Sequence, residues 1–304
     1  MKALVVGARG AVGRVVVEEL RKAGHVVTSA GRSAAGELAV DLRQPSGLRI
    51  LHEVMQDHDV VINASGIENP GIAEVGPFVE ASATSAYLAH LAELVPADSK
   101  AVLGAGLAPG LSSILIAALA TRPGDEVDLG VMLGTGQRHG AAAVAWTAGL
   151  IGKAIHAPPE GGVVRNFIER RALPGADGRL RKYLRADFPD HVLVGRRRDI
   201  AVRSYLAVGG RAATWALSQV GRYPLARALV AKSLHIGSEE WHLAALNRRT
   251  GETLVARGVG QSTATGVLAA LAAERLVDER PNGAVSMEAI VTLPEATNRL
   301  VELS

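Results

Sequence analysis

Three glycines near the start of the chain have the spacing of a turn that holds phosphate groups. Gly7, Gly10 and Gly13 follow an apolar strand expected over residues 3–6 and lead into a helix expected over residues 14–23. The first glycine permits a tight turn, the second lets the backbone approach a pyrophosphate, and the third lets the helix pack on the sheet. This order of strand, glycine turn and helix predicts a site for a dinucleotide.

Backbone N–H groups at the start of this helix are the expected partners of the phosphates. Ala11 and Val12 lie inside the glycine turn. The first N–H groups of a helix have no acceptor within the helix, and the helix dipole adds a partial positive charge there. An ordinary strand-to-helix turn that holds no ligand is the alternative.

Residues after the second expected strand favour NADP over NAD. That strand, residues 25–30, runs into Arg32 and Ser33, where an NAD-binding chain would place an acid for the ribose 2′-hydroxyl. A guanidinium at this place suits the 2′-phosphate of NADP through charge-assisted hydrogen bonds. Arg9, inside the glycine turn, is expected to face the same region, although both arginines could simply be exposed.

Small and polar residues at the ends of the next two expected strands complete the predicted cofactor site. Asp41 ends one strand, and its carboxylate is expected to accept a hydrogen bond from the adenine amine. Asn63 ends the other strand and could lie beside the cofactor or serve as a turn former. Ala64, Ser65 and Gly66 follow it, and their small size leaves room for the ribose and nicotinamide.

Proton transfer needs a group beside the cofactor, and two side chains are candidates. None of the four tyrosines is followed four residues later by a lysine, which argues against a short-chain dehydrogenase mechanism. Tyr87, a histidine or water then remains as the proton donor. His139 is the leading histidine, because it lies on an expected strand-to-helix turn and an ordinary histidine pKa of about 6.5 suits proton exchange. A surface histidine is the alternative.

The elements that must position these groups alternate between strands and helices in the first half. Strands are expected at residues 38–42, 59–63 and 100–103. Helical patterns are expected at residues 49–57 and at residues 78–94, the latter interrupted near residues 84–85. A continuous apolar strand is typical of a parallel sheet buried on both faces. This half therefore predicts an α/β fold, a doubly wound parallel sheet of the Rossmann type.

The second half predicts an α+β domain with a mostly antiparallel sheet. The expected strands are residues 126–133, 163–171, 191–194, 200–208, 240–248 and 252–260, and the expected helices are residues 141–155, 214–233 and 261–276. The basic stretch over residues 179–198 is expected to be a solvated hairpin or loop. The predicted domains are a dinucleotide-binding domain at 1–123, a substrate and dimerisation domain at 124–258, and a C-terminal helical return to the first domain at 259–304.

Composition narrows the classes of partner. The 304 residues are 48% hydrophobic, which allows a large core. A formal net charge of +3 is too small to indicate nucleic-acid binding. The chain has no cysteine and no cluster of histidines and acids with metal-ligand spacing, so no metal site is expected. Met1 leads directly into a strand and no uncharged apolar stretch spans a membrane, so we expect a cytoplasmic protein without membrane contact.

Three stretches of the chain follow one another as in a known family. They are the glycine turn at residues 5–13, residues 59–64 followed by residues 78–89, and the G-x-x-P-G turn at residues 106–110. In this order they resemble the saccharopine dehydrogenase-like, or saccharopine reductase-like, oxidoreductases, most clearly over residues 1–120. The family's usual aspartate two residues after the tyrosine is an alanine here, so the role of that carboxylate does not carry over.

The resemblance implies a Rossmann domain, a second domain that covers the nicotinamide and joins a homodimer, and nicotinamide-dependent oxidoreduction. It also places Gly106 in the cofactor site. The predicted function is an NADPH-dependent reductase that transfers a hydride to an imine or carbonyl of a small organic substrate, with secondary metabolism as one setting. An enoyl reductase and a non-catalytic NADP-binding sensor or assembly subunit are the alternatives.

Overall fold

Both ends of the chain belong to one structural unit, and the middle forms another. The computed structural model describes residues 1–32, 38–134, 141–209, 211–222, 239–279 and 281–301. Its two units are Met1–Ile114 with Ser262–Ser304, here called unit 1, and Leu115–Gln261, called unit 2. Ser33 and His139 lie outside the described residues, so their predicted roles stay predictions.

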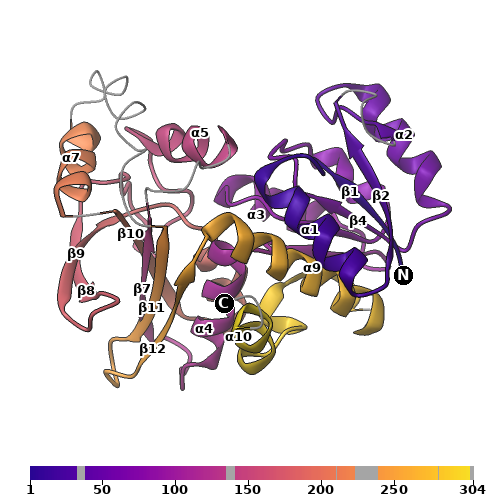
Figure 1. Ribbon diagram of the computed structural model, residues 1–304. Coiled ribbons are helices and arrows are strands. Elements are labelled where there is room, and N and C mark those ends of the chain that lie inside the picture. The colour runs from indigo at the N-terminus through magenta and orange to yellow at the C-terminus, as the bar shows by residue number, and fades with distance from the viewer. Residues whose placement is uncertain (33–37, 135–140, 210, 223–238, 280, 302–304) are drawn as a thin grey trace. The chain divides into compact units, whose positions relative to one another are not determined.

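A parallel sheet of seven strands forms the centre of unit 1 (Figure 1), in the order β13-β6-β5-β4-β1-β2-β3. All neighbouring strands run parallel. The strands are β1 (Lys2–Val6), β2 (Val26–Gly31), β3 (Leu38–Ala39), β4 (Val60–Asn63), β5 (Phe78–Glu80), β6 (Lys100–Leu103) and β13 (Gly283–Ser286). The chain moves outward from β1 in one direction and then, from β4, in the other, which confirms the predicted doubly wound α/β fold.

The central strands are buried on both faces because they carry apolar side chains at consecutive positions. Leu4 and Val5 of β1 and Ile62 of β4 expose none of their surface. Parallel strands covered on both faces need such continuous runs. The register pairs Val6 with Asn63, so the carboxyl ends of β1 and β4 meet at one edge of the sheet.

Helices and short helical turns connect the strands of unit 1. They are α1 (Ala11–Lys22), α2 (Pro45–Met55), η1 (Pro70–Glu74), α3 (Ser85–Leu94), η2 (Leu107–Leu111), α9 (Gln261–Glu279), η5 (Met287–Ala289) and α10 (Leu293–Val301), and α4 (Ser112–Ala118) leads into unit 2. Helix α9 packs tightly against α1, because a Cβ at Gly266 would lie 2.6 Å from the Cβ of Val15. In the described part of the chain, every helix is too short or too polar to cross a membrane.

Three segments of unit 1 differ from the sequence prediction. Residues 78–94 are predicted as a helical pattern interrupted near Thr84 and Ser85. Helix α3 begins at Ser85, but Phe78–Glu80 forms strand β5 between β4 and β6. Pairing with two neighbouring strands outweighs the helical pattern there. Strand β3 is limited to Leu38–Ala39. The C-terminal segment, predicted as helical, also contributes β13, which pairs with β6.

A mixed sheet of six strands forms the centre of unit 2, in the order β12-β11-β7-β10-β9-β8. The strands β7 and β10 are parallel, and all other neighbours are antiparallel, as the sequence predicts. The strands are β7 (Glu126–Leu133), β8 (Arg170–Pro174), β9 (Leu180–Arg185), β10 (Ala201–Val208), β11 (Glu240–Asn247) and β12 (Thr253–Val259). The helical elements are α5 (Ala141–Leu150), η3 (His191–Gly195), α6 (Arg196–Arg198) and α7 (Arg211–Arg222).

The basic stretch over residues 179–198 is partly exposed, as the sequence predicts, but its middle part is buried. Its first part forms β9, which makes the expected hairpin with β8. Arg185 of β9 is only 1% exposed, donates to the carbonyl oxygen of Ser204 at 3.1 Å and lies over the ring of Tyr205. Residues 191–194, predicted as a strand, instead form the π-helical turn η3. Burial of the long side chain of Arg185 is made possible by these partners from β10.

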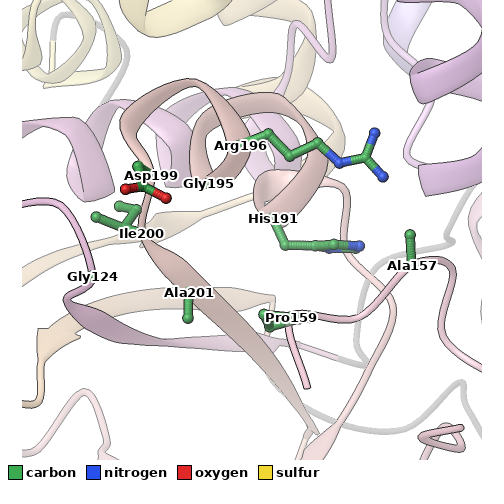
Figure 2. A pocket seen from close by; sticks show the side chains of 9 residues that line it. All are labelled: Gly124, Ala157, Pro159, His191, Gly195, Arg196, Asp199, Ile200 and Ala201. Atoms are coloured by element: carbon green, nitrogen blue, oxygen red, sulfur yellow. The ribbon is translucent and has the colours of Figure 1, made fainter. Parts of the chain in front are cut away.

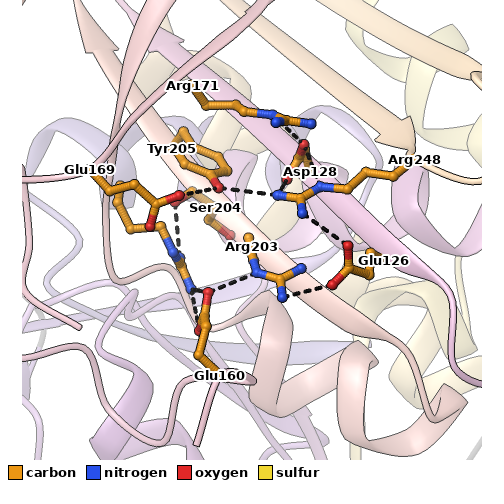
Figure 3. Close-up of polar contacts among 10 residues, drawn as sticks. Glu126, Asp128, Glu160, Glu169, Arg171, Arg203, Ser204, Tyr205 and Arg248 are labelled. Atoms are coloured by element: carbon orange, nitrogen blue, oxygen red, sulfur yellow. Dashed lines mark hydrogen bonds and ion pairs between the residues drawn. The ribbon is translucent and has the colours of Figure 1, made fainter. Parts of the chain in front are cut away.

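Unit 2 contains a connected network of ion pairs (Figure 3). Asp128 of β7 has a fully buried side chain and lies 2.8 Å from Arg171 and 2.6 Å from Arg248. Arg248 also binds Glu126, which in turn lies 2.8 Å from Arg203 of β10. Two guanidinium groups therefore neutralise a carboxylate that water does not reach, and they tie strands distant in sequence together.

Replacing Gly13 with alanine is expected to destabilise unit 1. A Cβ at this residue would lie 2.7 Å from the carbonyl carbon of Gly7 and 2.9 Å from the Cα of Ala8, and both are backbone atoms. Helix α1 would have to move off the turn, at a cost of about 1–3 kcal/mol. Gly149→Ala is the matched control, because nothing lies within 4 Å of its Cβ. Thermal unfolding should show a lower midpoint for Gly13→Ala alone, and equal midpoints would contradict the steric argument.

Asp128→Asn is expected to destabilise unit 2 strongly. The substitution leaves two arginines beside a buried amide, and breaking a buried ion pair costs about 3–5 kcal/mol. Asp177→Asn is the control, because Asp177 pairs with Arg181 at the surface, where ion pairs contribute little. Urea unfolding should separate the two variants clearly. Similar small losses for both would show that the buried network is not important for stability.

Candidate functional site

The glycine turn lies at the carboxyl edge of the parallel sheet and is held by close backbone contacts. Gly7 has a φ of +84° and donates its N–H to the carbonyl oxygen of Ala30 at 2.9 Å. A Cβ at Gly7 would lie 2.5 Å from the Cα of Ser65, in the loop after β4. Only glycine therefore lets the turn after β1 meet the loop after β4.

The start of helix α1 is open to an anion. Gly10 is the N-cap and has no side chain to cap the helix, and the first turn contains no acidic residue. Helix geometry leaves the N–H groups of Ala11, Val12 and Gly13 without an acceptor inside the helix. Such a helix start attracts phosphate groups. The structure thus brings the predicted glycine-turn residues together through close backbone contacts.

Asn63 holds the loop after β4 with every part of its amide. Its Nδ2 donates to the carbonyl oxygen of Ile67 at 3.0 Å and to Oε2 of Glu80 at 2.8 Å. Its Oδ1 accepts from the backbone N–H of Ser65 at 3.2 Å and from its hydroxyl at 2.6 Å. Asn63 therefore acts as a turn former for residues 64–66, which we call the cofactor loop, and its side chain is used within the protein.

Arginine side chains gather where β2 and β3 end. The guanidinium Nη2 of Arg9 lies 3.9 Å from the place that a Cβ would take at Gly31. Arg32 follows directly after β2 and is exposed. Arg43, which the sequence analysis overlooks, donates to both carboxylate oxygens of Asp41 at 3.0 Å and holds its pKa below the usual range, with a smaller effect from Arg32. The predicted bond from Asp41 to adenine would therefore compete with Arg43.

Glu80 is a buried acid at this edge that the sequence analysis also overlooks. It ends β5 and is 1% exposed. Its carboxylate accepts from Asn63, from the backbone N–H of Ser82 at 3.0 Å and from the phenol of Tyr87 at 3.1 Å. Burial raises the pKa of Glu80 to about 7, although these donors favour the charged form. Glu80 can therefore gain or lose a proton near neutral pH.

Tyr87 lies against Glu80 as a buried hydrogen-bond donor. The phenol is 3.1 Å from Oε2 of Glu80 and 3.4 Å from the carbonyl oxygen of Asn69. Burial, and then the charge of Glu80, raises the pKa of Tyr87 far above its usual value. A phenol that holds its proton so strongly is a weak acid, so this environment suits a supporting role for Tyr87. Its predicted role as proton donor stays a prediction.

Gly106 lies where η2 meets the start of α9. A Cβ at this residue would lie 2.9 Å from Cγ2 of Thr265. A small residue is therefore needed for α9 to approach the turn after β6. The contact between Gly106 and the cofactor stays a prediction.

Unit 2 contains a cavity of about 330 Å³ (Figure 2). His191, Arg196 and Asp199 contribute its titratable side chains. Nδ1 and Nε2 of His191 lie 2.9 and 2.6 Å from the carbonyl oxygens of Phe188 and His156, and burial lowers the pKa of His191. Because both ring nitrogens face backbone carbonyls, the imidazole is engaged within the protein and is a poor candidate for chemistry in the cavity.

Metal ligands are not grouped in the described part of the chain. No three His, Asp or Glu side chains among those residues lie close enough together to hold a metal ion. The polar groups of the unit 1 site instead suit a ligand that carries phosphates and ribose hydroxyls.

Comparisons with known proteins point to the same part of the chain. Residues 3–101 match the NAD dependent epimerase/dehydratase family. This segment contains the glycine turn, the cofactor loop and Glu80, and it is about a third of the chain. No curated protein matches the chain.

Matches to solved structures cover nearly the whole chain at low identity. An engineered D-amino acid dehydrogenase bound to NADP⁺ is 16% identical with a TM-score of 0.49, and the match covers 96% of this chain and 94% of that one. Diaminopimelate (DAP) dehydrogenase of C. glutamicum, in complex with DAP, is 16% identical with a TM-score of 0.48 and the same coverage. The WlbA dehydrogenase of Thermus thermophilus, in complex with NAD and UDP-GlcNAcA, is 12% identical with a TM-score of 0.44, over 99% and 92% of the two chains.

Glu80→Gln is expected to change how stability depends on pH. The pKa of Glu80 is raised in the folded state, so its protonated form stabilises the fold fully below about pH 4.5, and this contribution is lost as the pH rises through about 7. A rise from 4.5 to about 7 corresponds to about 3 kcal/mol. The wild type should lose this stability between pH 4.5 and 7.5 relative to Glu80→Gln, as measured by urea unfolding at several pH values.

Glu93→Gln is the matched control, because Glu93 is an exposed glutamate on α3 of the same unit. It should keep the pH dependence of the wild type. If Glu80→Gln and Glu93→Gln follow the same curve, Glu80 does not titrate with a raised pKa.

Proposed function

We propose that this chain is an NAD(P)-dependent oxidoreductase that prefers NADP and reduces an imine or carbonyl of a small organic substrate. The observation that carries the proposal is the contact of the Gly7 turn with the cofactor loop at the point where the strand order reverses. Dinucleotides bind outside the carboxyl ends of the strands at such a point. The match of residues 3–101 to an NAD dependent family supports this placement.

The preference for NADP rests on the charges at the ends of β2 and β3. Arg9 lies over Gly31, and Arg32 follows it, where an NAD-binding chain would need an acid. Asp41 is the acid in this region, and Arg43 neutralises it by a two-point hydrogen bond. A 2′-phosphate would therefore meet guanidinium groups rather than an uncompensated carboxylate.

The chain's own residues would bind and orient the cofactor. The N–H groups of Ala11, Val12 and Gly13 would hold the pyrophosphate, and Arg9 with Arg32 the 2′-phosphate. Asn63 would keep the cofactor loop in place. The bound cofactor supplies the hydride. His139, Tyr87 or water is the proposed proton source, and the hydrogen bond from Tyr87 to Glu80 favours His139 or water.

The proposed family, location and oligomeric state follow the resemblance to the saccharopine dehydrogenase-like oxidoreductases. We propose that the chain belongs to that family and forms a cytoplasmic homodimer. A C=C reductase is a second catalytic candidate. A non-catalytic NADP-binding sensor or assembly subunit would use the same dinucleotide site without turnover.

Calorimetric titration with NADPH and NADH tests the cofactor assignment. The wild type should bind NADPH more tightly than NADH. Arg9→Ala should lower the affinity for NADPH by about tenfold or more, the size of a charge-assisted hydrogen bond, and leave NADH little changed. Arg49→Ala, on the exposed side of α2, removes the same charge as a control and should match the wild type. Equal affinity for both dinucleotides, or no binding, would contradict the proposal.

Turnover of NADPH distinguishes the proposed enzyme from a non-catalytic NADP-binding sensor. Oxidation of NADPH is followed by its absorbance in the presence of 2-oxo acids with ammonia, ketones and activated alkenes. Tight binding of NADPH with no turnover on any of these classes would favour the sensor.

A further inference from the structure

Beside the cofactor loop, Glu80 lies at the centre of a hydrogen-bonded cluster with Asn63, Tyr87 and Ser82, here called the Glu80 cluster. The carboxyl of Glu80 is buried, and its described hydrogen-bond partners are all neutral. Burying a carboxylate without a cation beside it lowers the stability of the fold. Stability alone therefore does not explain a glutamate at this position.

The cluster can accommodate both protonation states of Glu80. When Glu80 is charged, the phenol of Tyr87 donates to Oε2 over 3.1 Å. When Glu80 is protonated, Oε2–H can donate to the phenol oxygen, while the phenol turns its proton to the carbonyl oxygen of Asn69 at 3.4 Å. Tyr87 lies between a carboxyl and a backbone acceptor, so when Glu80 takes up a proton from solvent, rotation of the phenol O–H bond keeps both groups hydrogen-bonded.

The side chain of Asn63 connects the Glu80 cluster to the cofactor loop. Asn63 donates to Glu80 at 2.8 Å and holds Ser65 and Ile67 with the rest of its amide. A charged carboxylate accepts this bond more strongly than a protonated one, since a hydroxyl oxygen is a weaker acceptor. The charged form therefore fixes Asn63, and with it the loop that contacts Gly7, more firmly.

We propose that Glu80 is a positioning residue for the cofactor loop, and that dinucleotide binding selects its charged form and releases its proton. This inference rests on the proposed function. Among the described residues, Tyr87 belongs to the cluster and Glu68 lies near it, and the charge of Glu68 acts on the same phenol. Since Tyr87 holds its proton strongly, Glu80 is the group of the cluster that exchanges a proton near neutral pH.

Calorimetry in two buffers measures the released proton. NADPH is titrated into the wild type at pH 7 in PIPES and in Tris, whose heats of ionisation differ. With a pKa of about 7, Glu80 is half protonated before binding, so about half a proton should be released per site. The affinity for NADPH should therefore rise between pH 6 and 8. Glu80→Gln should bind with no buffer-dependent heat, and Glu93→Gln should behave as the wild type.

A second measurement needs no cofactor. The backbone amide resonances of Ser65 and Ile67 in the free wild-type protein should shift with a midpoint near pH 7, in step with the ¹³C resonance of one glutamate carboxyl. This movement should be absent in Glu80→Gln.

The outcomes separate the two proposals. Tight NADPH binding with equal heats in both buffers would overturn the role of Glu80 and leave the cofactor assignment intact. Uptake of a proton on binding would overturn the inferred direction. Failure to bind either dinucleotide would overturn the proposed function and the proton linkage together. Loop resonances that do not follow pH would show that Glu80 does not act on the loop.

Discussion

The site in unit 1 depends on one close approach between two backbone segments. Gly7 turns the chain after β1, and its missing side chain lets Ser65 of the cofactor loop lie directly against it. Gly13 allows the same closeness between the turn and the start of α1. These contacts leave no room for a side chain, so the surface they form is made of backbone N–H groups. That surface suits phosphate groups because it offers fixed donors and no competing acid.

Charge is distributed in two ways around this backbone surface. Toward the ends of β2 and β3, arginines dominate, and the acid among them is paired with Arg43. Toward the end of β5, a single carboxyl is buried among neutral donors, and burial raises the pKa of Glu80 to about 7. The first environment is suited to a phosphate, and the second to a group that changes its charge when the neighbouring loop is ordered.

The sequence predicts the backbone of this site better than its side-chain chemistry. Glycine spacing and a continuous apolar run identify β1, α1 and β4, because turn geometry and burial on both faces restrict the residue types. The helical pattern over residues 78–94 does not indicate that Glu80 ends a buried strand. The turn formers Gly76 and Pro77, just before Phe78, are the sequence signal for a new strand there.

Long-range pairing explains the other differences. Strand β13 pairs with β6, which lies nearly two hundred residues earlier in the chain. No local sequence pattern predicts a pairing over that separation. The bond between Arg43 and Asp41 is local, yet it decides whether Asp41 is available to a ligand. Arg185 has a basic side chain in a charged stretch, and only the fold reveals that the ring of Tyr205 covers it. Such details depend on tertiary contacts, which the sequence pattern of one chain does not contain.

A crystal structure of the protein with NADP⁺ tests the central claim most directly. The account predicts the pyrophosphate at the N–H groups of Ala11 and Val12 and the 2′-phosphate within hydrogen-bond distance of the guanidinium group of Arg9 or Arg32. A dinucleotide bound elsewhere, or a 2′-phosphate that faces solvent away from both arginines, would contradict it.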